Sequence, residues 1–292
     1  MKVFLNVFAG IAASMAALFS VPAFAADEPK FTLEPTSDWR LDQQSDRCRI
    51  TRSFGTGKDR ISLRIDQGGP EPFYTLMLVG RPVRHPYGRV IRIQFGPQED
   101  PIYRGYITAK SNAGTPALVM YGVALSPVTG EQAEKGVTPL SAERKSAIDT
   151  LSLSRSIVSP FALKLGSMGE PLDRLQVCAT QLARKLNLPN MITSENSRPA
   201  KLLMDQDELE DSINYPWDLV RQGMEGKIDF RLTVSAQGKP TACHILATNR
   251  PQMFDDAVCL SLMKNAQFEP ALDANGNPQA SYFEQAIQFI IK

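Results

Sequence analysis

The stretch YPWDLVRQGMEGKIDFRLTVSAQGKP, residues 215–240, carries the clearest structural pattern in the chain. Apolar and polar residues alternate from Lys227 to Val234, which would place them on opposite sides of an extended strand. The apolar side consists of Ile228, Phe230, Leu232 and Val234, and the polar side of Lys227, Asp229, Arg231 and Thr233. The pattern predicts a half-buried antiparallel strand with one face in contact with water.

Helix and turn signals surround this strand. Pro216 suits the first turn of a helix, and Gly223 can end that helix in a left-handed conformation. Gln237-Gly238-Lys239 predicts a short hairpin connection. A second strand (241–248), a helix (251–265) and a last alternating strand (281–291) follow. The predicted order is therefore helix, strand, strand, helix, strand.

This order and a set of turn residues resemble the TonB C-terminal domain family over residues 213–292. The resemblance rests on Tyr215-Pro216, Gly223, Gly226, Gly238, Asp255 to Val258, Phe268-Glu269-Pro270-Ala271 and Gly276-Asn277-Pro278. It implies a small αββαβ domain whose last strand pairs with a segment of an outer-membrane protein. By analogy, the partner-binding residues are Tyr282, Glu284, Gln285, Gln288 and Ile290, and the same sheet edge could form a homodimer.

Three features depart from a typical TonB energy transducer. The chain has no Pro-rich spacer, and a β-rich segment stands in its place. The stretch ATNRPQMFDD lacks the serine-rich turn expected in that family. Cys243 and Cys259 are a further variation, and their strand-to-helix placement would allow a disulfide worth about 3 kcal/mol.

Residues 1–25 have the pattern of a secretory signal peptide. Lys2 precedes an apolar stretch, and Ala23-Phe24-Ala25 matches a cleavage site. Cleavage after Ala25 predicts a periplasmic protein whose mature form does not span the membrane. The alternative is a retained inner-membrane anchor, because the uncharged run from Val3 to Ala26 is long enough to cross a bilayer.

Composition narrows the class of partner. The chain has 32 basic and 31 acidic residues, so loss of Lys2 with the leader leaves it formally neutral. A neutral chain does not favour nucleic acid or an anionic membrane surface. The chain has only two histidines and no C-x-x-C pair, which argues against a metal site, and we expect no cofactor.

Residues 27–188 predict an antiparallel β-rich domain, a sheet or small barrel, closed by one helix. The strands are predicted at 61–66, 73–79, 89–95, 103–110, 117–125 and 161–165, with a loop or short helix at 126–145. The closing helix follows Gly169 and carries Leu172, Leu175, Cys178, Leu182 and Leu186 on one face. Residues 189–212 predict a linker. The fold class is therefore α+β.

The remaining cysteines and the candidate chemical groups leave alternatives open. Cys178 and Cys48 form either a disulfide or two separately buried thiols.

Arg81, Arg84 and Arg89 around His85 could hold an anion or simply be solvated. Trp39 and Trp217 could bind a partner or pack in a core. Gly55-Thr56-Gly57-Lys58 lacks the spacing of a phosphate loop, and Gly166-Ser167-Met168-Gly169 is not a nucleophile elbow.

These observations favour a binding protein over an enzyme. We expect an exported periplasmic protein whose C-terminal module binds envelope protein or peptide segments by edge-strand pairing. The alternative is a membrane-anchored TonB-type energy transducer that supports transmembrane transport. A third hypothesis is an exported enzyme with its site in the N-terminal domain. A catalytic triad anywhere in the chain would have to use His85 or His244.

Overall fold

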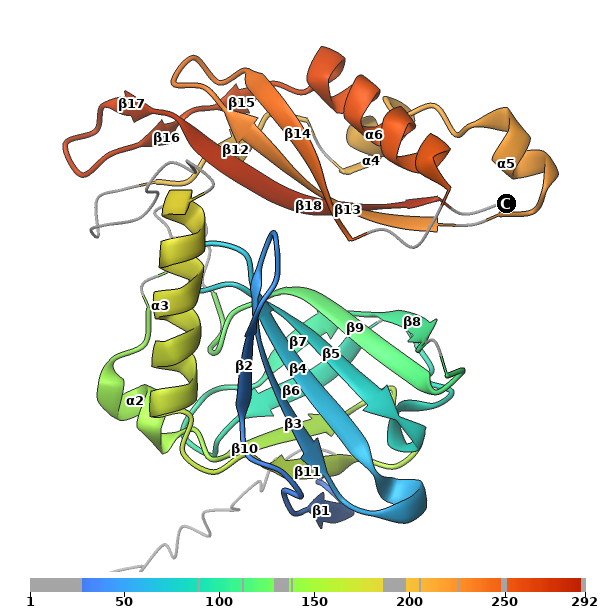
Figure 1. The fold of residues 1–292 in the computed structure, drawn as a ribbon, viewed down its shortest axis with the longest axis vertical. Helices are drawn as coiled ribbons and strands as arrows, with labels where there is room; N and C mark the ends of the chain where they lie inside the picture. Colours follow the sequence, from blue (N-terminus) through green and yellow to red (C-terminus); the bar gives the residue numbers. More distant parts are fainter. Residues whose placement is uncertain are drawn as a thin grey trace, which may run out of the picture.

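The computed structural model describes residues 28–88, 90–111, 113–128, 137, 139–185, 198–204, 206–224, 226–247 and 251–289. They form two units with separate hydrophobic cores, one between Leu33 and Leu182 and the other between Ala200 and Phe289. The C-terminal unit lies across one end of the N-terminal unit (Figure 1). The predicted signal peptide lies outside the described residues. None of the helices in the described part is long and apolar enough to cross a membrane.

The N-terminal unit consists of two sheets and one long helix. The five-stranded sheet has the order β1 (Phe31–Leu33), β11 (Phe161–Lys164), β10 (Thr150–Ser154), β6 (Val90–Phe95) and β7 (Ile102–Gly105). The six-stranded sheet has the order β2 (Arg40–Gln43), β3 (Cys48–Phe54), β4 (Ile61–Gln67), β5 (Tyr74–Gly80), β9 (Pro116–Val123) and β8 (Ile107–Lys110). Short 3-10 turns η1 (Gly57–Asp59) and η2 (Arg81–Val83) follow β3 and β5. Within these two sheets the pairing is antiparallel except between β1 and β11.

The segment predicted as one strand, 103–110, is two strands in different sheets. β7 pairs with β6, and β8 pairs with β9, with Tyr106 between them. The Tyr106 hydroxyl donates a hydrogen bond to the carbonyl oxygen of Gly88 at the corner. Alternation of side chains continues through such a corner, so the sequence pattern did not reveal the change of sheet.

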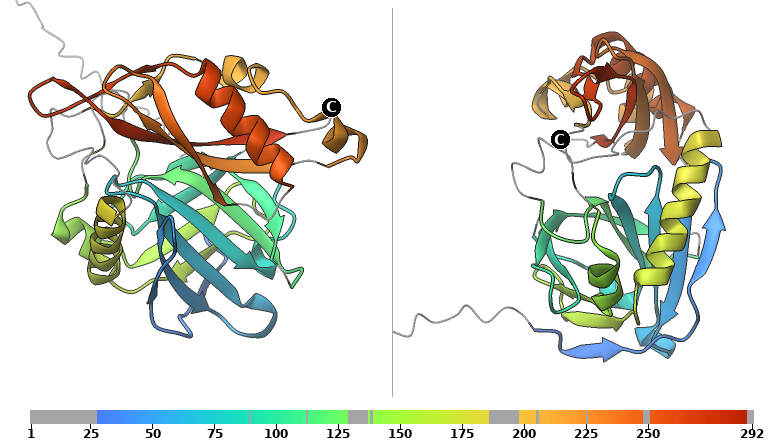
Figure 2. Two further views of the ribbon diagram at one scale, coloured as in Figure 1. Left: turned by 45° about the horizontal axis from the view of Figure 1, so that its top comes forward. Right: turned by 90° about the vertical axis from the view of Figure 1, so that its left-hand side faces the viewer.

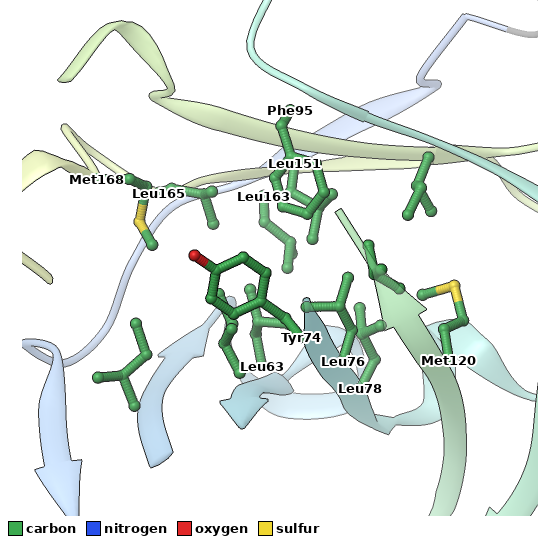
Figure 3. Close-up of a cluster of buried hydrophobic side chains, with 14 of the residues drawn as sticks. Leu63, Tyr74, Leu76, Leu78, Phe95, Met120, Leu151, Leu163, Leu165 and Met168 are labelled. Atoms are coloured by element: carbon green, nitrogen blue, oxygen red, sulfur yellow. The ribbon is translucent and has the colours of Figure 1, made fainter. Parts of the chain in front are cut away.

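Side chains from the two sheets meet in the N-terminal core. Leu63 and Leu76 of the six-stranded sheet face Leu151 and Leu163 of the five-stranded sheet, and all four are fully buried (Figure 3). The alternating buried and half-buried residues of β4 and β5 explain this packing, because every second side chain points between the sheets.

A disulfide fastens the predicted closing helix to the sheet. α3 (Gly169–Lys185) lies beside β2 and β3 (Figure 2), and its Leu172, Leu175 and Cys178 are buried. Cys178 is bonded to Cys48 at the start of β3, with the two Cα atoms 6.0 Å apart. The bridge joins residues 130 positions apart in sequence. A short helix, α2 (Ala142–Ala147), occupies the end of the predicted loop and packs on α3.

The C-terminal unit has the predicted order of elements. α5 (Trp217–Arg221) precedes β13 (Gly226–Val234), β14 (Pro240–Ala247), α6 (Gln252–Asn265) and β18 (Ser281–Phe289). The three long strands form a sheet in the order β14-β13-β18, and α6 covers one face of it (Figure 1). A Cys243–Cys259 disulfide joins β14 to α6. Gly223 and Gly238 adopt the left-handed conformations that the turn predictions require, with φ of 65° and 74°.

The predicted linker is too long at its C-terminal end. Residues 189–197 lie outside the described residues, but β12 (Lys201–Leu202) and α4 (Gln206–Asp211) belong to the C-terminal unit. β12 pairs with β15 (Phe268–Glu269), and Arg198 bridges to Leu272 in β16 (Ala271–Leu272), which pairs with β17 (Pro278–Gln279). Because this segment is polar and acidic, the sequence carried no signal for β12 or α4. β12 is stabilised by pairing with the distant strand β15.

Candidate functional site

The two faces of the C-terminal sheet are buried in different ways. Its apolar face, with Ile228, Phe230, Leu232 and Val234 at 0% exposure, packs against α6 and its surroundings. The opposite face was predicted to contact water, and this prediction is wrong for Asp229 and Arg231, which are only 7% and 2% exposed. We call this side, formed by Asp229, Arg231, Tyr282 and Glu284, the charged face. The N-terminal unit covers it.

Arg231 makes the central contact between the two units. Its Nη2 donates hydrogen bonds to the backbone oxygens of Gly68 (3.0 Å) and Asp46 (3.2 Å) in the N-terminal unit. Its Nε donates to Glu284 Oε1 at 2.6 Å, and the guanidinium lies 5.3 Å from the centre of the Tyr282 ring. A buried guanidinium needs such partners, because unpaired burial of a charge is costly.

A second arginine crosses the boundary in the opposite direction. Arg47 in the N-terminal unit donates a hydrogen bond to the backbone oxygen of Leu246 in β14. The register of β14 against β13 shifts between Asp229 and Phe230, which leaves Leu246 as the extra residue of a bulge. A bulge leaves backbone groups outside the ladder. Arg47 supplies a donor for this carbonyl.

Carboxylates of the N-terminal unit pair with Arg47 and with the nearby Arg49. Asp66 accepts two hydrogen bonds from Arg49, each 2.7 Å long, and lies 3.9 Å from Arg47. Asp46 forms an ion pair with Arg47 at 2.8 Å. The hydrogen bond to Asp66 raises the pKa of Arg49. The result is a paired network of charges rather than a solvated surface.

Tyr121 of β9 contacts Asp229 across the same boundary. Burial raises the pKa of Tyr121, and the charge of Asp229 and a hydrogen bond to it raise it further. The tyrosine therefore stays protonated and can donate to the Asp229 carboxylate. The charged face thus receives partners from both β9 and the turns of the N-terminal unit.

The turn between β4 and β5 fits closely against the charged face. A Cβ atom on Gly69 would lie 1.5 Å from the Tyr282 hydroxyl, and one on Gly68 would lie 2.7 Å from Arg231 Nη2. Only glycine allows this approach. Gln176 of α3 braces the turn by donating to the Pro70 oxygen at 2.7 Å and by accepting from Gln67 at 2.8 Å.

A cavity of about 420 Å³ lies where the two units meet. We call it the interdomain cavity. Its walls combine apolar groups with charged groups from both units: Asp46, Arg47, Asp66, Gly68, Gly69, Glu71, Phe73, Tyr74, Thr75, Arg104, Tyr121, Gly122, Pro199, Ala200, Asp229, Arg231, Leu246, Tyr282, Phe283, Glu284 and Gln285. Its size and its place between two units are typical of small-molecule sites.

Glu71 is the carboxyl group with the strongest perturbation in this cavity. Burial raises its pKa from 4.5 to about 8, and the nearby negative charge of Glu284 adds to the effect while Arg231 opposes it. Its Oε1 is inaccessible to solvent and has no hydrogen-bond partner in the described structure. At neutral pH Glu71 is therefore mainly a neutral carboxylic acid that can donate a hydrogen bond.

Two further groups of the cavity wall have unused hydrogen-bonding capacity. The Tyr282 hydroxyl and Arg104 Nε are shielded from solvent, and neither has a hydrogen-bond partner among the described residues. Burial lowers the pKa of the Arg104 guanidinium. No pattern in the sequence singled out Glu71, Arg104 or the interdomain role of Arg231. The adjacent glycines 68 and 69 could have indicated this site, because glycine allows another part of the chain to approach the backbone closely as well as allowing a turn.

Among the predicted partner-binding residues that the structure describes, Gln285 lies on a different face of β18 from Tyr282 and Glu284. Tyr282 and Glu284 belong to the charged face and contact Arg231. Neighbouring residues of a strand alternate between its two faces, so Gln285 lies on the face opposite to that of Glu284 and is paired with Phe230 of β13. The side chain of Gln288 and the whole of Ile290 lie outside what the structure describes.

The backbone of β18 offers a sheet edge. β18 pairs over its nine residues with β13, and within the described residues no strand pairs with its other side. An edge strand carries unpaired N–H and C=O groups that can pair with another chain. This edge, rather than a set of side chains, is the feature that can bind an extended segment.

The other groups considered from the sequence lie elsewhere. Trp39 packs on the N-terminal core beside Phe54, whereas Trp217 is 70% exposed on α5. His85 is exposed in the loop after η2, and His244 is exposed on β14. No group of three or more potential metal-binding side chains occurs in the part of the chain that the structure describes.

Comparison with known proteins identifies one region of the chain. The family described as Gram-negative bacterial TonB protein C-terminal matches residues 211–291. The solution NMR structure of the Pseudomonas aeruginosa TonB C-terminal domain is similar at 25% identity and a TM-score of 0.26, covering 32% of this chain and 87% of that one. No curated protein matches the chain. The region that contains β13, β14, α6 and β18 is a TonB C-terminal domain.

Proposed function

We propose that this protein binds a segment of an outer-membrane or other envelope protein through the free edge of β18. A TonB C-terminal domain indicates a role in the Gram-negative envelope. The observation that carries the proposal is the pairing of β18 with β13 on one side alone, within the described residues. Backbone hydrogen bonds to an added strand would supply affinity, and neighbouring side chains would supply specificity.

The N-terminal unit limits which side chains can take part. Tyr282 and Glu284 hold the contact between the units, so we assign them to that contact and not to the partner. Gln285, Gln288 and Ile290 remain the proposed partner-binding side chains. Since the N-terminal unit covers the charged face, it also orients the edge of β18 toward one direction of approach.

Adjacent proline substitutions test edge pairing. Backbone N–H groups of neighbouring strand residues point to opposite sides, so only one of Gln285→Pro and Ala286→Pro removes a donor from the β13 ladder. The other removes a donor from the free edge and should leave the sheet folded. Photo-cross-linking from position 288 in Gram-negative cells would then report on the partner.

The outcomes of this experiment are distinct. We expect the full chain to give a discrete cross-link to an envelope protein, and the folded proline variant to lose it. A folded variant with unchanged cross-links, or no cross-link to any envelope protein from the wild-type chain, would contradict edge pairing. A homodimer cross-link that the same variant abolishes would instead show that the edge pairs with a second copy.

We further propose that residues 1–25 are removed on export and that the mature protein is an adaptor in the periplasm, without a catalytic role. The sequence pattern at Ala23-Phe24-Ala25 supports this. The intact mass of the natively expressed protein tests it. Loss of residues 1–25 is the expected result, and a full-length mass would instead support an anchored energy transducer.

A further inference from the structure

One end of the N-terminal unit lies opposite the C-terminal unit. β4 runs from Ile61 to Gln67, and the turn that follows it contacts Arg231 of the C-terminal unit. The start of β4 is therefore about 20 Å from that contact. Gly80 at the end of β5 pairs with Ile61, so η2 begins at this remote end as well. Figure 1 shows β1 at the same end.

Four connections between strands and the first described residues meet at this end. β9 begins beside the end of β5, which places the β8–β9 connection next to η2. The Tyr87 N–H donates to the Ser156 oxygen at 2.9 Å, and the Lys30 N–H donates to the Pro160 oxygen at 2.8 Å. We call this surface the basic end and define it as residues 28–30, 55–60, 81–88, 110–111, 113–115 and 155–160.

Positive charge is in excess at the basic end. Seven exposed cationic side chains stand against two exposed carboxylates, those of Glu28 and Asp59. The seven cations are Lys30, Lys58, Arg60, Arg81, Arg84, Lys110 and Arg155. None of them forms an ion pair or a side-chain hydrogen bond with a described residue. The nearly neutral total charge of the chain therefore conceals a local positive excess.

The cations form a two-dimensional array. Those on the connections of the six-stranded sheet are spread over the ends of four neighbouring strands, β4, β5, β9 and β8, which span about 15 Å. Arg155 adds a charge from the five-stranded sheet, about 10 Å away across the core. An extended peptide presents its charges along a line, whereas the headgroups of an anionic membrane form a surface of charge. The array therefore matches a membrane better than a peptide.

Exposed apolar side chains lie among these cations. Tyr87 is 58% exposed and Val158 is 61% exposed, on the two connections that the Tyr87–Ser156 hydrogen bond joins. Aromatic and aliphatic groups next to cations are typical of surfaces that enter the headgroup region of a bilayer.

The position of this end in the chain also favours a membrane. Only residues 27–30 separate the uncharged run from Val3 to Ala26 from β1, and four residues reach at most about 14 Å. Any membrane that the uncharged run enters during export therefore adjoins the basic end.

We propose that the basic end binds the surface of an anionic phospholipid membrane. Its cations pair with lipid phosphates, and Tyr87 and Val158 enter the headgroup layer. The C-terminal unit then lies on the side of the molecule that faces away from the lipid (Figure 1). This inference does not depend on the protein partner of β18.

Vesicle co-sedimentation of the natively expressed chain tests this inference. The anionic vesicles are phosphatidylcholine with about one third phosphatidylglycerol, and pure phosphatidylcholine vesicles control for binding by a retained apolar leader. We expect at least about tenfold tighter binding to the anionic vesicles, and a loss of this preference as salt rises from about 50 to 500 mM. Equal binding to both kinds of vesicle, or no binding to the anionic ones at low salt, would overturn the proposal. Binding of poly-glutamate by a chain that ignores the anionic vesicles would point to an acidic protein partner instead.

Charge-matched variants locate the contact. The double variant Lys58→Gln/Lys110→Gln should bind anionic vesicles about 10- to 30-fold more weakly, because each charge near the surface contributes about fivefold. Lys201→Gln/Lys239→Gln is the control, since it removes two exposed lysines from the C-terminal unit. Unfolding curves check that both variants are folded. Equal weakening by the two pairs would show that total charge, and not the basic end, decides the binding.

Hydroxyl-radical footprinting on vesicles identifies the bound face. Relative to phosphatidylcholine vesicles, anionic vesicles should slow the oxidation of Tyr87 at least about threefold, because the lipid covers it. Trp217, which is 70% exposed on the C-terminal unit, should react at an unchanged rate. Protection of Trp217 with Tyr87 still reactive would place the opposite end on the membrane and overturn the proposal.

Discussion

The two faces of the C-terminal sheet are both buried, but by different physical means. On the apolar face, Phe230 and its neighbours pack against α6, where area removed from water stabilises the contact. On the charged face, Arg231 is equally inaccessible, but it is held by a few directed hydrogen bonds from the N-terminal unit. Apolar packing tolerates small changes of shape, whereas a buried polar contact depends on every partner.

The largest expected effect is on the apolar face. Phe230→Ala should lower the free energy of unfolding by about 3–5 kcal/mol, because it removes a fully buried ring and leaves a cavity. Denaturant unfolding with hydrogen exchange should show the loss in the C-terminal unit. Phe73→Ala is the control, since Phe73 is 37% exposed. Similar losses in both variants would contradict the difference in burial.

Breaking the charged face should separate the units and leave the C-terminal sheet folded. Arg231→Met leaves Glu284 and two backbone carbonyls without their donor, so we expect a loss of about 3 kcal/mol. Limited proteolysis should cut the connection between the units faster. Arg221→Met is the control, because its ion pair with Asp218 is exposed. A stability equal to wild type would show that the charged face does not hold the units together.

Glu71 makes the contact between the units pH-dependent. Burial raises its folded-state pKa to about 8, against 4.5 for an unperturbed glutamate, so the folded state binds more protons between these values. Stability should therefore fall as pH rises from about 4.5 to 8, by on the order of a few kcal/mol, and stay low above that.

Glu71→Gln removes this titration and isolates its contribution. The variant should be more stable than wild type at pH 9 and should lack the decline that Glu71 causes. Glu269→Gln, at an exposed position, serves as the control. Unfolding curves measured from pH 5 to pH 9 check this. Parallel profiles for Glu71→Gln and wild type would refute the burial of this carboxyl.

The smallest effect is expected for the Tyr282 hydroxyl. Tyr282→Phe removes a buried hydroxyl that has no hydrogen-bond partner among the described residues, so stability should change by less than about 0.5 kcal/mol. Tyr282→Ala also removes the ring stacked on Arg231 and should cost more. Chemical denaturation distinguishes them. A large loss for Tyr282→Phe would mean that the hydroxyl has a structural partner.

Local patterns predicted much of the fold. Alternation located β13 and β18, helical spacing located α3, and the spacing of turn residues indicated the TonB-like order. The Cys48–Cys178 and Cys243–Cys259 bridges are both present. The strands and helices depend on residues close in sequence, where short-range physics decides the outcome, whereas the Cys48–Cys178 bridge joins residues 130 positions apart.

The interdomain site could not be predicted in the same way. Alternation placed Asp229 and Arg231 on one side of a strand, but it did not tell whether water or another unit covers that side. The partners of Arg231 are backbone carbonyls of Asp46 and Gly68, and a backbone oxygen carries no signature in the sequence. Glu71 looks like any surface glutamate until the fold surrounds it.

Hydroxyl-radical footprinting of the intact chain tests most directly whether the N-terminal unit covers the charged face. Tyr282 is 7% exposed, whereas Tyr87 and Tyr103 are 58% and 52% exposed and act as internal standards. We predict that Tyr282 is oxidised far more slowly than both standards, and that Arg231→Met raises its rate toward theirs. Oxidation of Tyr282 in the wild-type chain at the rate of Tyr103 would show that the charged face is open to water.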